Sequence, residues 1–188
     1  MPFLLDPTGP DFRSRPILFI DLEVTGLDRH QHEIVEIAAL RVDQPDFTVT
    51  NSFYTKVIPE HIETADPKAL SIINYSKEAW VDAIPLQQAI EELAAFAPDS
   101  ILAGWSVQTE WDFLCEACLQ LQIPYFFTHR LLEVYTLAFV HFYKETDMKY
   151  INLSKVSKAL GIPLDQHKPD SDVRATYEIF KKLFAQQT

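Results

Sequence analysis

The sequence predicts an α/β fold in which a mixed central β-sheet is flanked by α-helices. Three successive strands are indicated by apolar or alternating stretches at residues 17–23, 34–42 and 47–58. Beyond these the apolar spacing becomes helical, apart from a short apolar stretch at 101–105 that indicates one more buried strand. A strand meander followed by helices and at least one further strand favours a mixed sheet with helices packed on it.

The predicted helices follow the three strands of the meander. Within residues 66–97, Leu86, Ile90, Leu93 and Phe96 recur at helical spacing, and this amphipathic stretch stops before Pro98. The remaining helices are expected at residues 109–121, 131–143, 152–160 and 171–185.

Composition predicts one folded domain. Hydrophobic residues make up 47% of the 188 residues and Gly only 4 of them, which suits a buried core and argues against general disorder. We expect residues 16–188 to form a single domain after an extended N-terminal arm, residues 1–15, which carries three prolines and lacks the apolar core of a secretory signal. No stretch nears the ~18 apolar residues of a membrane span, so we expect a cytoplasmic protein with no membrane partner.

The net charge of −11 has the wrong sign for a protein that grips long nucleic acid through a basic surface. Any nucleic-acid substrate is therefore expected to be short or bound by its end. Bound divalent cations would locally reverse the charge that a phosphate meets.

The sequence contains one closely spaced pair of cysteines and one of histidines. Such pairs can bind metal or carry out redox chemistry, but the sequence around both pairs argues against either role. Cys115 and Cys118 are spaced C-x-x-C, but no second ligand pair completes a zinc site and the surrounding pattern is helical. We expect two small buried hydrophobic residues. His30 and His32 lie in a predicted turn, where surface side chains are expected.

The strongest chemical signal is a pair of carboxylates at the end of the first predicted strand. Asp21 and Glu23 are two residues apart, so their side chains point to the same face with Cα atoms ~6.6 Å apart. Two like charges beside an apolar core need a cation between them, or one takes up a proton. The pair therefore indicates a metal site. The alternative is a solvated strand-end Glu23 and a turn-forming Asp21.

Helical geometry offers a third carboxylate. In the helix predicted at 109–121, Glu110 lies at the edge of the apolar face, whereas Asp112 projects to the opposite side. Glu110 is therefore the better inward candidate. Alternatively, Thr109 caps this helix with Asp112 in a capping box, and Glu110 only interacts favourably with the positive end of the helix.

The last predicted helix offers a fourth carboxylate. Asp172 lies at the margin of the apolar face in the first turn, where it can face inward. Five residues earlier, His167 lies in a loop, and a histidine of near-neutral pKa is the usual general base for activating a water. The alternative is a surface histidine and an aspartate that stabilises the helix dipole.

These residues resemble the signature of the DEDDh 3′-to-5′ exonucleases, which include the proofreading subunit of bacterial DNA polymerase III, RNase T and oligoribonuclease. Residues 21–26 match the first motif, D-x-E-x-T-G, and residues 33–38 match the E-I-V-E-I-A that follows it. His167 and Asp172 match the third motif, H-x-x-x-x-D, before a terminal helix. The resemblance covers residues 17–184 and implies a ribonuclease H-like fold.

The second motif departs from the family pattern. Many members have G-H-N-x-x-F-D-x-x-F-L, and residues 104–114 match it without a gap if Glu110 stands where the family has Asp. A two-residue shift of the loop would give this role to Asp112. Residues 130–137 also resemble the family, again with Glu where Asp is common. The replaced His-Asn pair and Phe of the motif correspond to Trp105, Ser106 and Thr109.

The resemblance implies a metal-dependent exonuclease that releases nucleoside 5′-monophosphates from the 3′ ends of single-stranded DNA or RNA. In that scheme His167 is the general base and two Mg²⁺ or Mn²⁺ ions suit an all-carboxylate shell. The implied metal ligands are Asp21, Glu23, Glu110 and Asp172, and the implied substrate contacts are Thr25, Gly26 and Leu27. A homodimer and a polymerase-type partner both stay open.

Because the second motif is altered, two other functions are also compatible with the sequence. One is a catalytically weakened nucleic-acid-binding or scaffold module of the same fold. The other is a phosphodiesterase that uses the same site on short oligonucleotides. DNA and RNA are not separated, because contacts to sugar and bases make that distinction and no motif specifies them.

Overall fold

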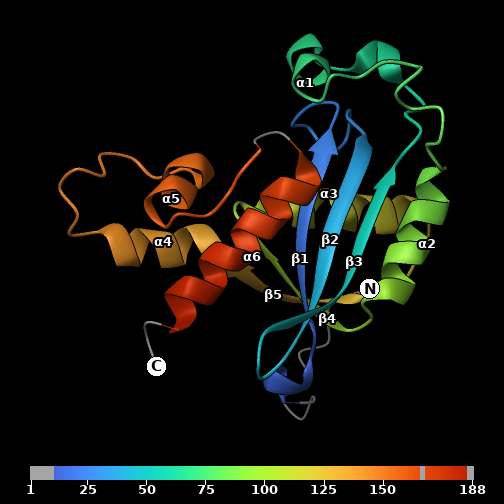
Figure 1. The fold of residues 1–188 in the computed structure, drawn as a ribbon. Helices are drawn as coiled ribbons and strands as arrows, with labels where there is room; N and C mark the ends of the chain where they lie inside the picture. The colour runs from blue at the N-terminus through green and yellow to red at the C-terminus, as the bar shows by residue number, and fades with distance from the viewer. Residues whose placement is uncertain (1–10, 166–167, 186–188) are drawn as a thin grey trace.

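The computed structural model describes residues 11–165 and 168–185 and shows a five-stranded mixed β-sheet between helices (Figure 1). The strands are β1 (Ile17–Val24), β2 (Ile34–Asp43), β3 (Thr48–Lys56), β4 (Ser100–Gly104) and β5 (Phe127–Glu133). Their order is β3-β2-β1-β4-β5, with antiparallel pairing from β1 to β3 and parallel pairing of β1, β4 and β5. The predicted α/β class, a mixed central sheet flanked by helices, is confirmed.

Helices cover both faces of the sheet. Helices α2 and α3 pack on one face, and α4, α5 and α6 pack on the other (Figure 1). None of the helices in the described part of the chain is long and apolar enough to cross a membrane. The helices are α1 (Pro67–Ile72), α2 (Leu86–Phe96), α3 (Val107–Gln120), α4 (Val134–Phe142), α5 (Leu153–Ala159) and α6 (Pro169–Ala185).

Strand β1 is central because its side chains alternate between the two apolar cores. Leu18 and Ile20 belong to the core beneath α2 and α3, whereas Ile17 and Phe19 belong to the core beneath α6. A strand presents every second side chain to the same face. The odd-numbered positions that follow, 21 and 23, therefore point to the α6 face.

Helix α6 is anchored over β1 by its aromatic residues. Phe19 meets Tyr177 and Phe180 edge-to-face, with ring centroids 5.5 and 5.3 Å apart, and each such pair contributes about 0.5–1.5 kcal/mol beyond its buried area. The Tyr177 hydroxyl also donates a hydrogen bond of 2.8 Å to the carbonyl of Phe47. These contacts fix the middle of α6 against β1, and the first turn of α6 lies toward the carboxyl end of that strand (Figure 1).

The structure corrects three predicted boundaries. Residues 127–133 form β5, because they pair in parallel with β4, and the helix predicted at 131–143 starts only at Val134. The stretch at 66–97 is divided into α1 and α2. Helix α3 starts at Val107 rather than at 109.

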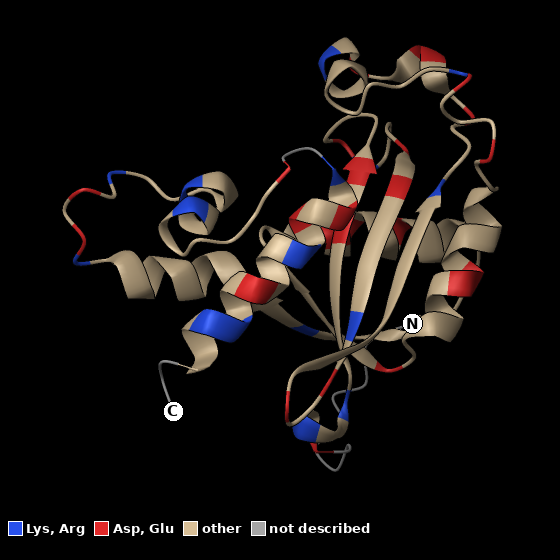
Figure 2. Cartoon of the chain, in the orientation of Figure 1, with Lys and Arg blue, Asp and Glu red and all other residues tan. Residues whose placement is uncertain are grey.

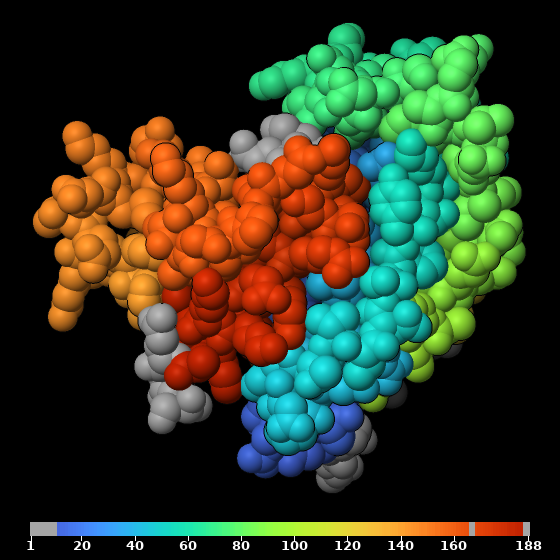
Figure 3. Space-filling model, in the orientation of Figure 1, coloured from blue at the N-terminus to red at the C-terminus, as the bar shows by residue number. Residues whose placement is uncertain are grey.

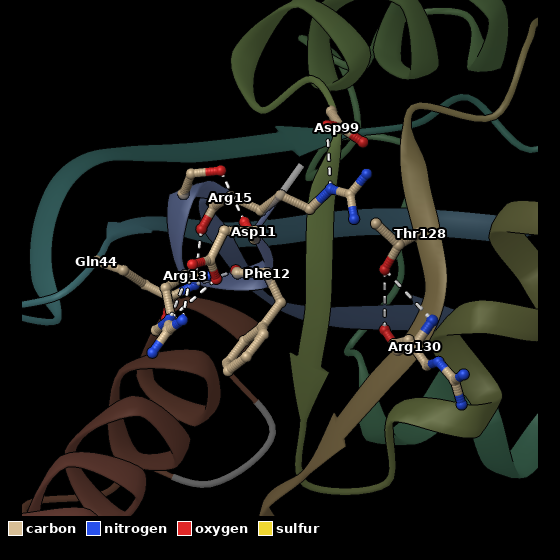
Figure 4. Close-up of polar contacts among 9 residues, drawn as sticks. Asp11, Phe12, Arg13, Arg15, Gln44, Asp99, Thr128 and Arg130 are labelled. Atoms are coloured by element: carbon tan, nitrogen blue, oxygen red, sulfur yellow. Dashed lines mark hydrogen bonds and ion pairs between the residues drawn. The ribbon is translucent and has the colours of Figure 1, made fainter. Parts of the chain in front are cut away.

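The N-terminal segment packs at the end of the sheet opposite the carboxyl end of β1 (Figures 1 and 4). The Gln44 side-chain amide donates hydrogen bonds of 2.9 and 2.8 Å to the carbonyls of Phe12 and Arg15, and Arg15 pairs with Asp99 at 3.1 Å. Within the arm predicted to be extended, Phe12–Ser14 form a single 3-10 turn. Residues 1–10 lie outside the described part of the chain.

Candidate active site

Four of the predicted site residues come from three elements that meet at one edge of the sheet. Asp21 and Glu23 lie near the carboxyl end of β1, Glu110 lies in the first turn of α3, and Asp172 in the first turn of α6. Because β4 runs parallel to β1, the helix that follows β4 begins beside the carboxyl end of β1. Figure 2 shows acidic residues on β1, β2 and the start of α6 gathered in this region.

Burial and mutual repulsion make these carboxylates hard to ionise together. Burial raises the pKa of Asp21 well above its ordinary value, helped by repulsion from Glu110, Asp172 and Glu23. Burial, with repulsion from Glu36 and Asp172, raises the pKa of Glu23 to about 7. Burial also raises the pKa of Glu110 to about 8. At neutral pH the group holds protons or needs a compensating cation.

The structure brings Glu110, and not Asp112, to the pair on β1. Glu110 is 8% exposed, and its Oε2 atom is buried without a hydrogen bond to any described residue. The side chain of Asp112 is 38% exposed and pairs with Arg29 at 3.5 Å. Ser106, rather than Thr109, occupies the N-cap of α3. The capping-box alternative for Thr109 and Asp112 is therefore wrong.

Glu36 is a buried carboxylate at this site that was not among the predicted site residues. It lies directly opposite Glu23 in the antiparallel register of β1 and β2 and is 6% exposed. The Tyr54 hydroxyl donates to it at 3.2 Å, and the Lys56 ammonium lies 3.8 Å away. Burial raises the pKa of Glu36 despite these two contacts. The available signal was the position of Glu36 near the start of β2, combined with the meander register that sets it opposite Glu23.

Glu133 is a second carboxylate that the site prediction omitted. It ends β5 opposite Gly104 of β4, and its side chain accepts a hydrogen bond of 3.2 Å from the N–H of Tyr135. Burial raises the pKa of Glu133, and the nearby N–H groups of Tyr135 and Val107 partly offset this, so the carboxylate lies beside the first turns of both α4 and α3. Repulsion from Glu133 contributes to the raised pKa of Glu110.

The turn after β1 holds the three predicted substrate contacts in different environments. Thr25 is fully buried, and its hydroxyl accepts a hydrogen bond of 2.9 Å from the N–H of Glu33. A Cβ on Gly26 would lie 2.4 Å from the ring of His32, so the glycine allows this ring to pack on the backbone. Leu27 is 86% exposed. A fixed turn thus presents one free apolar side chain to solvent.

His167 lies outside the described residues, so its predicted role stays a prediction. The loop before it is tied to α6, because the N–H of Asp165 donates a hydrogen bond of 2.8 Å to the hydroxyl of Ser171.

Both cysteines are free thiols on α3, with Cys118 buried and Cys115 half-buried. Burial raises the pKa of Cys115 to about 12 and that of Cys118 to about 11, which disfavours a reactive thiolate. Both side chains pack in or against the core beneath α2 and α3.

Comparison with known proteins assigns the chain to a family. A family model described as Exonuclease, the RNase T family, matches residues 18–180. The chain belongs to this exonuclease family. The DNA polymerase III epsilon subunit of Aquifex aeolicus is 26% identical to this exonuclease chain over 165 residues, covering 87% of this chain and 78% of that subunit. The PolC-type DNA polymerase III of Thermotoga petrophila is 23% identical over 178 residues, covering 92% of this chain and only 12% of the polymerase.

Solved structures share the fold of this exonuclease-family chain. The zinc-bound complex of E. coli exonuclease I with single-stranded DNA superposes with a TM-score of 0.78 at 18% identity, covering 93% of this chain and 41% of that one. Cell-death related nuclease 4 superposes with a TM-score of 0.74 at 14% identity, covering 91% and 64%. The predicted membership of the exonuclease family is confirmed.

Proposed function

We propose that this chain is a metal-dependent 3′-to-5′ exonuclease of the DEDDh type that releases nucleoside 5′-monophosphates from single-stranded 3′ ends. The convergence of Asp21, Glu23, Glu110 and Asp172 from three elements is the observation that carries the proposal. A fold gains no stability from buried carboxylates that repel one another. Bound cations would account for this cluster of carboxylates, because they would neutralise its mutual repulsion.

By its chemistry the donor set suits two hard divalent cations, Mg²⁺ or Mn²⁺, although no group of three or more of the described side chains is already arranged as a metal site. It contains only carboxylate oxygens, which these ions prefer. The buried Oε2 atom of Glu110 makes no hydrogen bond within the described residues. Burial, helped by repulsion from neighbouring carboxylates, raises the pKa of Asp21 and Glu23. When bound, the ions would neutralise phosphate charge and lower the pKa of a water nucleophile.

The chain's own residues would orient the substrate and move the proton. His167, by its family position, would accept the proton of the attacking water. The fixed turn of Thr25 and Gly26 would place its backbone beside the terminal sugar, and the exposed Leu27 side chain would contact the base. Because two relatives are DNA polymerase III chains, DNA is the first substrate to test, and a polymerase-type partner is the first protein partner to test.

A 5′-labelled single-stranded oligonucleotide incubated with Mg²⁺ or Mn²⁺ tests the proposal. We expect a ladder that shortens from the 3′ end and disappears in Asp21→Asn and Glu110→Gln. Asp112→Asn is the matched control, because it removes an exposed carboxylate of the same helix and should keep the ladder. No cleavage of DNA or RNA with either ion would overturn the proposal. Cleavage confined to dinucleotides would favour the short-oligonucleotide phosphodiesterase.

A further inference from the structure

We propose that a row of aromatic side chains, running from Trp105 along α4, is a track on which the bases of single-stranded DNA stack. The row consists of Trp105, Tyr135, Phe139 and Tyr143, and it is called the aromatic row below. The inference rests on the proposed exonuclease function. It extends that function from the terminal nucleotide to the strand that leads to it.

The four rings contact one another in sequence. Trp105 meets Tyr135 edge-to-face with ring centroids 5.9 Å apart, and Tyr135 is stacked with Phe139 at 6.5 Å. Phe139 and Tyr143 follow at 5.5 Å. The three rings on α4 recur every fourth residue, so they advance ~6 Å along the helix axis at each step. The rings therefore form a line rather than a cluster.

The three α4 members of the aromatic row are exposed and Trp105 is half-buried, although α4 packs well on the core through another face. Tyr135, Phe139 and Tyr143 are 40%, 44% and 72% exposed. The core contacts of α4 are made by another face, on which Val134, Ala138 and Phe142 are buried. Folding does not require aromatic residues at the exposed positions. A contiguous exposed aromatic surface is typical of a binding site.

The row begins at the elements that carry the carboxylate site. Trp105 directly follows β4 and precedes the N-cap of α3, whose first turn holds Glu110. Trp105 also packs against the core that contains Phe19, on the face of the sheet to which Asp21 points. Glu133, which repels Glu110, lies two residues before Tyr135. Single-stranded DNA whose 3′ end reached the carboxylates would pass over these rings where it leaves the site.

The local charge favours a nucleic acid as the occupant. Residues 143–160 carry four lysines and two acidic residues, a local charge of +2 in a chain of net charge −11. Figure 2 shows Lys and Arg recurring along α5 and the loop that joins it to α4, and Figure 3 shows that these segments form a lobe beside α6. Aromatic rings stack on any base, and lysines interact with phosphates. The four lysines are Lys144, Lys149, Lys155 and Lys158.

Binding of fluorescein-labelled dT12, measured by anisotropy with Mg²⁺ in the Asp21→Asn background, tests the row. We expect the double substitution Tyr135→Ala and Phe139→Ala to raise the Kd at least 10-fold, since each stacked base contributes roughly 5- to 150-fold in affinity. Val140→Ala is the matched control: this side chain is 62% exposed on the same helix but lies outside the row, and its Kd should stay within 2-fold. Circular dichroism verifies that each variant is folded.

Activity measured in the chain with an intact Asp21 separates this inference from the proposed function. We expect the double substitution to lower kcat/KM for dT12 and to leave kcat/KM for dT2 unchanged, because a dinucleotide is too short to reach the row. An equal loss of kcat/KM on dT12 and dT2 overturns the inference that the aromatic row binds the strand. An unchanged Kd for dT12, or no binding of dT12 at all, overturns it as well. A chain that cleaves neither substrate overturns the proposed function. Whether the aromatic row binds DNA is then still decided by comparing the Kd for dT12 with and without the double substitution.

Discussion

Substitution of Glu110 by Gln makes the folded protein less sensitive to pH when divalent ions are absent. Burial raises the pKa of Glu110 from 4.5 to about 8, so the folded state binds this proton more tightly than the unfolded state does. Below pH 4.5 both states are protonated, and the carboxyl does not oppose folding. As the pH rises from 4.5 to about 8, the unfolded state releases the proton first, and the free energy of unfolding falls.

The size of the effect follows from the pKa difference. Each unit of difference corresponds to about 1.4 kcal/mol, so this carboxyl lowers the free energy of unfolding by roughly 4 kcal/mol between about pH 5 and pH 9. For a chain of this length each kcal/mol shifts Tm by about 2–4 °C. Glu110→Gln should therefore be more stable than the wild type at pH 9 by roughly 10 °C, and much closer to it at pH 5.

Thermal unfolding followed by circular dichroism in EDTA measures this difference across the pH range. Asp112→Asn is the control, because its exposed ion pair with Arg29 contributes only about 0–1 kcal/mol. A Tm difference between Glu110→Gln and wild type that is the same at pH 5 and pH 9 would refute the reasoning. Mg²⁺ or Mn²⁺ at pH 9 should recover most of the lost stability in the wild type and little in Glu110→Gln.

Two further substitutions test the framework of the site. Gly26→Ala places a Cβ 2.4 Å from the His32 ring and should lower the free energy of unfolding by about 1–3 kcal/mol. Adding His32→Ala removes the ring and should restore the free energy of unfolding. If urea unfolding shows that the effects of the two substitutions simply add, this explanation is contradicted. Trp80→Phe removes the 3.2 Å hydrogen bond from the buried indole to the Val35 carbonyl and should reduce stability by about 1–2 kcal/mol. An unchanged urea midpoint would show that this bond does not hold the α1 region.

The sequence predicts the sheet and the site best where the pattern is local. The apolar run before Asp21 and Glu23 specifies a buried strand, and the period of two specifies the face of both carboxylates, as the structure shows. The inward position of Glu110 also follows from periodicity, because a shift of the helix start from 109 to 107 does not change the angles between residues on the helix.

What the sequence did not predict depends on contacts between distant segments. Residues 127–133 have few strand signals of their own and form β5 because they pair with β4. Glu36 joins the site only through the register that sets it opposite Glu23. Glu133 reaches the first turn of α3 only because β5 lies next to β4. Local periodicity carries no information about these pairings.

The contrast between surface and buried carboxylates supports a functional origin for the site. On the surface, Asp112 pairs with Arg29 and Glu116 lies 3.3 Å from His30. Glu110 is buried and Asp21 and Glu23 are half-buried, yet among the described residues these three carboxylates form no ion pair. A partner would be worth more there than on the surface. A sequence selected for stability alone would place neutral side chains at these positions. Local conflict of this kind is typical of sites at which a protein binds a ligand that resolves it.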